Sequence, residues 1–144
     1  MVCAFFGHRD TPSDIKPLLR DTLIHLITAE DARMFYVGNQ GAFDRMVIRT
    51  LSELKKEFSH ISLVVVLPYL PTAHTTFPSE AETVFPTVAT TVPRRYAIER
   101  VNHWMIEQSD TVISYITHTQ GGAAKFVRIA DNKKKRIVAL ANEI

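Results

Sequence analysis

The apolar run ISLVVVL at residues 61–67 limits the possible folds most strongly. A strand with one face in water alternates apolar and polar residues, whereas a nearly continuous apolar run rich in valine is typical of a strand covered on both faces. Strands of this kind occur mainly in parallel sheets that have helices on either side. The run therefore predicts an α/β domain with a buried parallel sheet.

The rest of the chain alternates between strand and helix patterns. Short β-rich runs predict strands at 2–6, 34–37, 61–67, 111–116 and 136–140. Apolar residues at helical spacing predict helices over 15–26, 43–58, 97–105 and 124–130. Five strands that alternate with helices call for right-handed crossovers in a parallel sheet. We therefore expect a doubly wound, Rossmann-like sheet with strand order 3-2-1-4-5 and helices on both faces.

The amino-acid composition limits the kinds of partner that the protein is expected to bind. The 144 residues are 46% hydrophobic, which suits a single domain spanning 1–144. The net charge of +2 is too small to indicate electrostatic nucleic-acid binding, although a pI near 8.8 leaves a local basic patch open. Cys3 is the single cysteine, which fits a reducing cytoplasm, and neither a membrane span nor an export signal is recognisable. We expect a soluble cytoplasmic protein with no membrane partner.

All glycines of the chain follow predicted strands on the same side of the sheet. They are Gly7, Gly38, Gly41, Gly121 and Gly122. In a doubly wound sheet the loops after the strands meet at one edge, and ligands bind where the strand order reverses. Glycine lets backbone N–H groups approach a ligand and turn into a helix whose N-terminus attracts anions. This placement predicts an anion-binding crevice, although glycines that serve only as turn residues are the alternative.

Polar residues accompany the glycines of the first two loops. In FFGHRD, His8 offers a base or a hydrogen-bonding ring and Arg9 an anion clamp, unless the two are simply solvated. In GNQGAFD, Asn39 offers amide recognition. Asp44 sits where a carboxylate could meet ribose hydroxyls or could complement the helix dipole. Both interpretations of Asp44 stay open.

The loop ITHTQGGAAK follows the fourth predicted strand. The amides of Gly121 and Gly122 open a helix with Lys125 one turn inside, which suits a phosphate group. Thr117 and His118 add a hydroxyl and an imidazole to the same rim. The loop is neither a Walker loop nor a dinucleotide Gly-x-Gly-x-x-Gly motif.

The long connection 68–93 holds five of the seven prolines and shows no convincing periodicity. A loop of this length is a lid, a binding loop or disordered, and we expect a lid because it leaves the ligand edge. Tyr69 could stack on a base or cover the edge of the core. In the next helix Arg95 is expected near the crevice, with Arg100 and Asn102 one to two turns below.

Two further patterns carry little functional signal. The six histidines show no metal-ligand spacing, so we expect neither a metal nor another cofactor. The basic run at 133–136 precedes the last predicted strand and therefore lies at the edge away from the crevice. A solvated turn is the expected role of this run, and nucleic acid is an unlikely partner.

Several segments together resemble the SLOG superfamily of Rossmann-like domains, in its small bacterial branch of uncharacterised proteins similar to YpsA. They are CAFFGHRD, FYVGNQGAFD, VVLPYLP, VNHWMIEQSDTVISYI and GGAAKF. The superfamily also includes, more distantly, the Lonely Guy phosphoribohydrolases and the DprA core. The resemblance implies a nucleotide or nucleotide-derived ligand, carried on Gly7, Arg9, Gly38, Gly41, Asp44, Asn102, Gly121 and Gly122. A homodimer is expected from the relatives alone.

The chain also departs from its relatives. Phosphoribohydrolases are similar to one another in a Gly-Gly-x-Gly-Thr loop followed by a glutamate, which the GGAAK loop lacks. Relatives tend to have arginine where this chain has Val101. We therefore expect binding or sensing of the ligand. An N-glycosidase that uses Asp44, with His8 as proton carrier, is the alternative, and a nucleic-acid-binding module is a further one.

Overall fold

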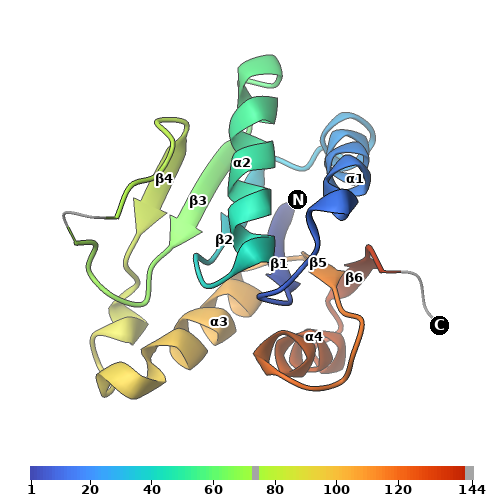
Figure 1. Ribbon diagram of the computed structural model, residues 1–144. Helices are drawn as coiled ribbons and strands as arrows, with labels where there is room; N and C mark the ends of the chain where they lie inside the picture. Colours follow the sequence, from blue (N-terminus) through green and yellow to red (C-terminus); the bar gives the residue numbers. More distant parts are fainter. Residues whose placement is uncertain (73–74, 142–144) are drawn as a thin grey trace.

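A wholly parallel β-sheet forms the centre of the computed structural model, which describes residues 1–72 and 75–141 (Figure 1). In these residues the strands are β1 (Val2–Gly7), β2 (Met34–Val37), β3 (Ser62–Val66), β4 (Ala81–Val84), β5 (Thr111–Tyr115) and β6 (Arg136–Ala139). Their order across the sheet is β4-β3-β2-β1-β5-β6. Each neighbouring pair is parallel.

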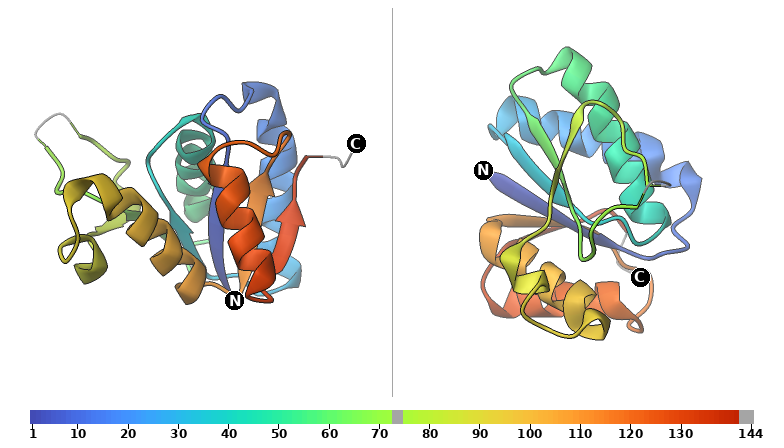
Figure 2. Two further views of the ribbon diagram at one scale, coloured as in Figure 1. Left: turned by 90° about the horizontal axis from the view of Figure 1, so that it is seen from below. Right: turned by 90° about the vertical axis from the view of Figure 1, so that its left-hand side faces the viewer.

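Helices cover both faces of this sheet. The α-helices are α1 (Lys16–Ala29), α2 (Ala42–Glu57), α3 (Ala97–Gln108) and α4 (Gly122–Asn132), and short 3-10 turns are η1 (Ser13–Ile15), η2 (Thr87–Ala89) and η3 (Arg94–Tyr96). Figure 2 (right) shows α1 and α2 on one side of the sheet and α3 and α4 on the other. No helix of the described chain is both long and apolar enough to cross a membrane.

The two layers of helices explain why the central strands are mostly apolar. Successive side chains of a strand point to opposite faces. In β1, Cys3 and Phe5 pack in the core below α1 and α2, whereas Ala4 and Phe6 pack in the core below α3 and α4. Phe6 stacks on Phe126 of α4 with ring centroids 5.8 Å apart. Burial raises the pKa of the Cys3 thiol to about 12, so this residue is an inert part of the core.

The sheet contains one more strand than we expected. The five predicted strands are present in the predicted order, as β3-β2-β1-β5-β6. The expected five-stranded sheet is nevertheless wrong, because β4 lies within the predicted loop 68–93 and pairs with the outer side of β3. Glu82 and Thr83 of β4 are exposed, and Pro78 and Pro86 flank the strand. An edge strand has no apolar pattern of its own, so its sequence reads as a loop.

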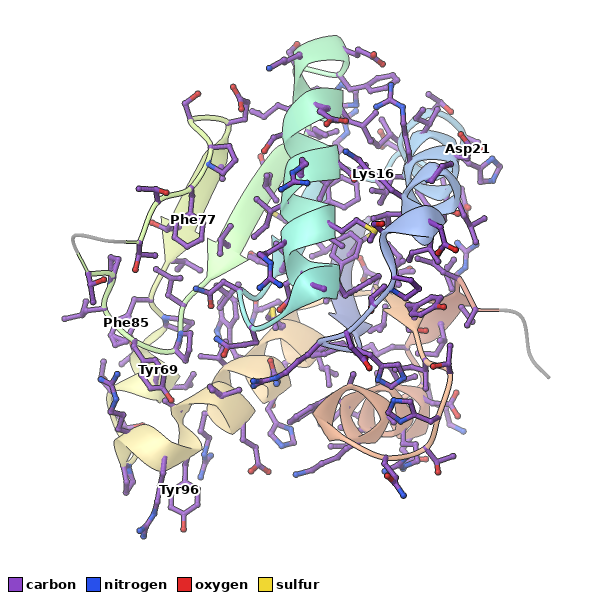
Figure 3. The ribbon with its side chains drawn as sticks, viewed as in Figure 1. Lys16, Asp21, Tyr69, Phe77, Phe85 and Tyr96 are labelled. Carbon is purple, nitrogen blue, oxygen red and sulfur yellow. The ribbon has the colours of Figure 1, made fainter. Side chains whose placement is uncertain are left out.

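The segment from the end of β3 to Phe85, just after β4, crosses the edge of the sheet, and its described residues contain no α-helix. Phe77 packs against the core below α1 and α2, while Tyr69 and Phe85 pack against the other core (Figure 3). Aromatic side chains from this segment therefore close both faces of the sheet at its β4 edge.

Candidate functional site

A cleft of about 580 Å³ opens at the carboxyl edge of the sheet. The loops that follow β1, β2 and β5 line it, together with the first residues of α2 and α4 and one side of α3. Phe5, Phe6, Met105 and Phe126 give it an apolar component. The strand order reverses between β1 and β5, so the cleft lies at the position where doubly wound folds bind ligands.

The cleft brings together most of the residues that the sequence pointed to. The predicted residues that line it are Gly7, His8, Arg9, Gly38, Gly41, Asp44, Arg95, Asn102, His118, Gly121 and Gly122. The predicted residues that lie elsewhere are Asn39, Tyr69, Arg100, Thr117 and Lys125. Among the described residues of the segment 68–93, none lines the cleft.

Packing accounts for two of the cleft glycines. A Cβ atom on Gly7 would overlap the ring of Phe43, which is completely buried at the start of α2. A Cβ atom on Gly41 would lie 2.6 Å from the Cα atom of Arg9. The same two loops are joined by a hydrogen bond of 2.9 Å from the Ala42 N–H group to the Arg9 carbonyl. Contact between the loops after β1 and β2 is therefore enough to require glycine at both positions.

Asp44 is the half-buried carboxyl group of the cleft. Its Oδ2 atom accepts a hydrogen bond of 2.9 Å from the backbone N–H of Gln40, so it closes the loop before α2 and satisfies a donor there. Burial raises the pKa of Asp44 to about 6, although the Gln40 amide and the charges of Arg9 and Arg45 act in the opposite direction. A carboxyl that titrates near neutral pH can accept or donate a proton. The Gln40 amide, in contrast, is already occupied within the protein.

His8 joins the loop after β1 to the loop after β5. Its side chain is buried, and its Nε2 atom accepts a hydrogen bond of 3.0 Å from the Thr117 N–H group. The His8 ring stacks on His118 with centroids 3.7 Å apart. Burial lowers the pKa of His8, and the charge of His118 adds to this effect while Asp10 opposes it. Neutral His8 therefore carries its proton on Nδ1, and a role as proton carrier through Nε2 requires it to release Thr117.

Two predicted ligand residues are held by other parts of the protein. The Lys125 ammonium lies 3.0 Å from the Glu99 carboxylate, which links α4 to α3. The Tyr69 ring is covered by the guanidinium group of Arg94, 4.0 Å from its centroid, and the Tyr69 hydroxyl donates to the Arg94 carbonyl. One face of the Tyr69 ring is therefore in use.

The remaining predicted residues outside the cleft are accounted for as follows. Arg100 lies in a separate groove with Tyr96 and His103. Tyr96 points away from the sheet in Figure 3, which places this groove on the outer side of α3. The side chain of Asn39 accepts a hydrogen bond of 2.9 Å from the side chain of Gln40.

Helix α3 also contributes residues that the sequence analysis missed. Ile98 and Glu99 line the cleft together with Arg95 and Asn102. Ile98, Glu99 and Asn102 fall on one side of α3 because residues three or four apart are neighbours on a helix surface. Arg95 belongs to the turn η3 directly before α3. Ile98 and Glu99 follow Arg95 by three and four residues, so the sequence spacing could have identified both. Gln120, which directly precedes the Gly121–Gly122 pair, was missed as well.

The charges around the cleft are mixed. Arg9 and Arg95 are basic, whereas Asp10, Asp44 and Glu99 are acidic. In the described parts of the chain, no group of three or more His, Cys, Asp or Glu side chains could hold a metal ion. An anionic ligand would therefore depend on the two arginines and on helix N-termini.

The fold and the cleft define a Rossmann-like α/β protein with a potential ligand site at the topological switch point of its parallel sheet. No protein-family model matches the chain, and no curated protein matches it. Functional inference therefore depends on the residues of the cleft and on the resemblance carried by the sequence motifs.

Proposed function

We propose that the cleft binds a nucleotide or a nucleotide-derived small molecule, and that the protein acts as a binding or sensing module. The observation that carries this proposal is the convergence of the loops after β1, β2 and β5 on one cleft. The guanidinium groups of Arg9 and Arg95 are suited to phosphate, and the amide of Asn102 is suited to a base or sugar. The resemblance to the SLOG superfamily supports the same class of ligand.

The start of α4 is the best candidate for the phosphate position. Neither helix has a side-chain cap among the described residues, but at α2 the first N–H group, that of Ala42, already donates to the Arg9 carbonyl and the Asp44 carboxylate lies in the first turn. The first N–H groups of a helix have no partner inside the helix, and an anion satisfies them. Gly121 and Gly122 are both exposed to the cleft, so a phosphate can approach this backbone. The segment 68–93 stays a predicted lid.

A ligand screen with a matched pair of arginine variants tests the proposal. Nucleoside phosphates, ADP-ribose, NAD and cyclic nucleotides are compared by thermal shift, because a ligand at 100 times its dissociation constant stabilises by about 2.7 kcal/mol. Arg95→Gln should weaken a hit at least tenfold in calorimetry. Arg100→Gln removes the same charge on the outer side of α3 and should leave the affinity unchanged. A screen without hits, or equal losses in both variants, would contradict the proposal.

Asp44 favours a second candidate function, an N-glycosidase that cleaves the bound nucleotide. Such an enzyme needs a carboxyl group that stabilises positive charge at the anomeric carbon or activates water. A half-buried carboxyl with a pKa of about 6 in the cleft has that capacity. Asp44→Asn should then abolish release of the free base, followed by mass spectrometry, and leave nucleotide binding largely intact. A wild-type protein that releases no base from any bound nucleotide removes this candidate.

A further inference from the structure

A depression of about 160 Å³ lies beside the cleft and has not been given a role so far. We call it the basic depression. Its polar lining consists of the cations Lys16, Arg45 and Arg49 and the hydroxyl residues Thr11 and Ser13. No acidic side chain from the described ranges 1–72 and 75–141 lines it.

A thin wall separates the basic depression from the cleft. Gly41 lines the cleft and the next residue, Ala42, lines the depression. Likewise, Asp44 lines the cleft and Arg45 lines the depression. The backbone contact between Ala42 and the Arg9 carbonyl forms part of this wall. A ligand in the cleft would therefore need to extend only over the Gly41–Ala42 backbone to reach the depression.

On the exposed side of α2, the acidic side chains form ion pairs within the described chain and the basic side chains do not. Residues 45, 49, 53 and 57 follow one another at four-residue spacing and share one side of the helix. Its C-terminal half is paired with α1, since Glu53 lies 3.1 Å from Lys16 and Glu57 lies 3.2 Å from Arg20. Lys16 lies between α1 and α2 (Figure 3). The acidic half of the row thus has a clear structural function.

The basic half of the row has no such function. The side chains of Arg45 and Arg49 form neither an ion pair nor a hydrogen bond with any other residue that the structure describes, and the charge of Arg45 acts only at longer range on Asp44. Like charges four residues apart destabilise a helix. Arg45 is also close to the positive end of the helix dipole, where a cation is unfavourable. Neither side chain is held by an ion pair with a described residue, and both line a concave surface with hydroxyl groups.

We propose that the basic depression binds a phosphate group through the guanidinium groups of Arg45 and Arg49, with Ser13 as a further donor. Arginine binds phosphate with two parallel hydrogen bonds, and two guanidinium groups on successive turns can hold one phosphate between them. The phosphate is either a free ion or the outer end of a longer ligand whose other end lies in the cleft. Only the second source rests on the proposed function.

Inorganic phosphate is the first probe. The Nε–Hε signals of the arginine side chains are followed by ¹H–¹⁵N NMR at constant ionic strength, with chloride as the balancing ion. The signals of Arg45 and Arg49 should shift and saturate, and the double variant R45Q/R49Q should bind phosphate at least tenfold more weakly. R49Q alone is a milder variant with the same expected direction.

The double variant K133Q/K134Q is the matched control. It removes the same charge from exposed positions beside the start of β6, at the opposite edge of the sheet. Its phosphate affinity should equal that of the wild type. Shifts that rise linearly without saturation, or an equal loss of affinity in both double variants, would overturn the phosphate site and leave only general charge attraction.

A 5′-phosphorylated dinucleotide and a mononucleotide separate the two sources of the phosphate. If one ligand spans both sites, R45Q/R49Q weakens the dinucleotide and not the mononucleotide, whereas Arg95→Gln weakens both. If R45Q/R49Q leaves the dinucleotide unaffected while phosphate still saturates Arg45 and Arg49, the free ion is the ligand. If neither nucleotide binds the wild type and phosphate saturates these arginines, the proposed function fails and the phosphate site stands.

Discussion

The loops that meet at the cleft all contain glycine but differ in how tightly they are packed. The loops after β1 and β2 are locked together, with Gly7 below the Phe43 ring and Gly41 against the backbone of Arg9. In the loop after β5, Gly121 and Gly122 are exposed, and no described atom would lie within 4 Å of a Cβ at either position. The comparison teaches that glycine at a ligand edge can reflect packing between loops or an open backbone. Only an open backbone offers its amides to a ligand.

The helices α2 and α4, which begin directly after these loops, differ in the same way. At α2 the Ala42 N–H group donates to the Arg9 carbonyl and the Gln40 N–H group just before the helix donates to Asp44, so part of the available donor capacity is used within the protein. At α4 no described side chain performs this role. An anion in the cleft is therefore stabilised more strongly by the N-terminus of α4 than by the N-terminus of α2. Changes at Gly7 and Asp44 should mainly affect stability, whereas changes at the α4 loop should mainly affect binding.

Gly7→Ala is the change with the largest expected effect. The new methyl group would overlap the fully buried Phe43 ring, and such overpacking costs about 3 kcal/mol of unfolding free energy. Urea denaturation measures the loss. In the double variant Gly7→Ala/Phe43→Leu the smaller side chain leaves room, so the combined loss should be less than the sum of the single losses. A loss below about 1 kcal/mol for Gly7→Ala would show that the two loops are not locked.

Asp44→Asn should stabilise the protein at pH 7 by about 2 kcal/mol, because the full pKa difference corresponds to about 3 kcal/mol and water around this half-buried carboxylate screens part of it. The folded pKa of Asp44, about 6, lies above its ordinary value of 3.8, so folding disfavours the charged form. Its contribution to stability is present below pH 3.8 and is lost as the pH rises through 6. The asparagine oxygen can still accept from the Gln40 N–H group. Denaturation curves between pH 4 and 8 check this, and a destabilised variant would mean that attraction to Arg9 and Arg45 outweighs burial.

Sequence patterns predicted the elements whose burial leaves a pattern in their own residues. The central strands are mostly apolar because both of their faces are covered, and this is visible in a single sequence. Strand β4 was missed because it depends on pairing with β3, while its own Glu82 and Thr83 face water. Pairing between segments that are distant in the chain leaves no periodicity to detect.

The same limit applies to the candidate site. Asn102 lies on the cleft side of α3, whereas Arg100, two residues earlier, is rotated by roughly 160° from it and lies in the outer groove. The wrong expectation that Arg100 lies near the cleft could have been avoided from residue spacing alone. The partners of Lys125 and Tyr69 could not be foreseen, because Glu99 and Arg94 lie about 25 residues away along the chain and meet them only in the folded protein.

Gly121→Ala is expected to cost about 1.5 kcal/mol, less than the change at Gly7. No side chain stands in the way, but φ is 93° and ψ is 170°, a backbone conformation that residues with a Cβ atom rarely adopt. The exposed loop can relax part of this strain. Urea denaturation of this variant beside Gly7→Ala separates backbone strain from packing. Equal losses in the two variants would remove the distinction between an open and a locked loop.

Gly122→Ala should change the unfolding free energy by no more than about 0.5 kcal/mol, because the position opens α4 and alanine is a better helix former than glycine. The variant therefore isolates the reason for this glycine. If a ligand approaches the bare backbone here, the new methyl group blocks it, and the affinity for a nucleotide found in the screen should fall at least tenfold while stability is retained. Unchanged affinity would place the phosphate elsewhere in the cleft, and a marked loss of stability would mean that this loop is packed as tightly as the loops after β1 and β2. Since the adjacent Gly121 differs from Gly122 in backbone conformation and not in surroundings, the pair separates the two requirements within one loop.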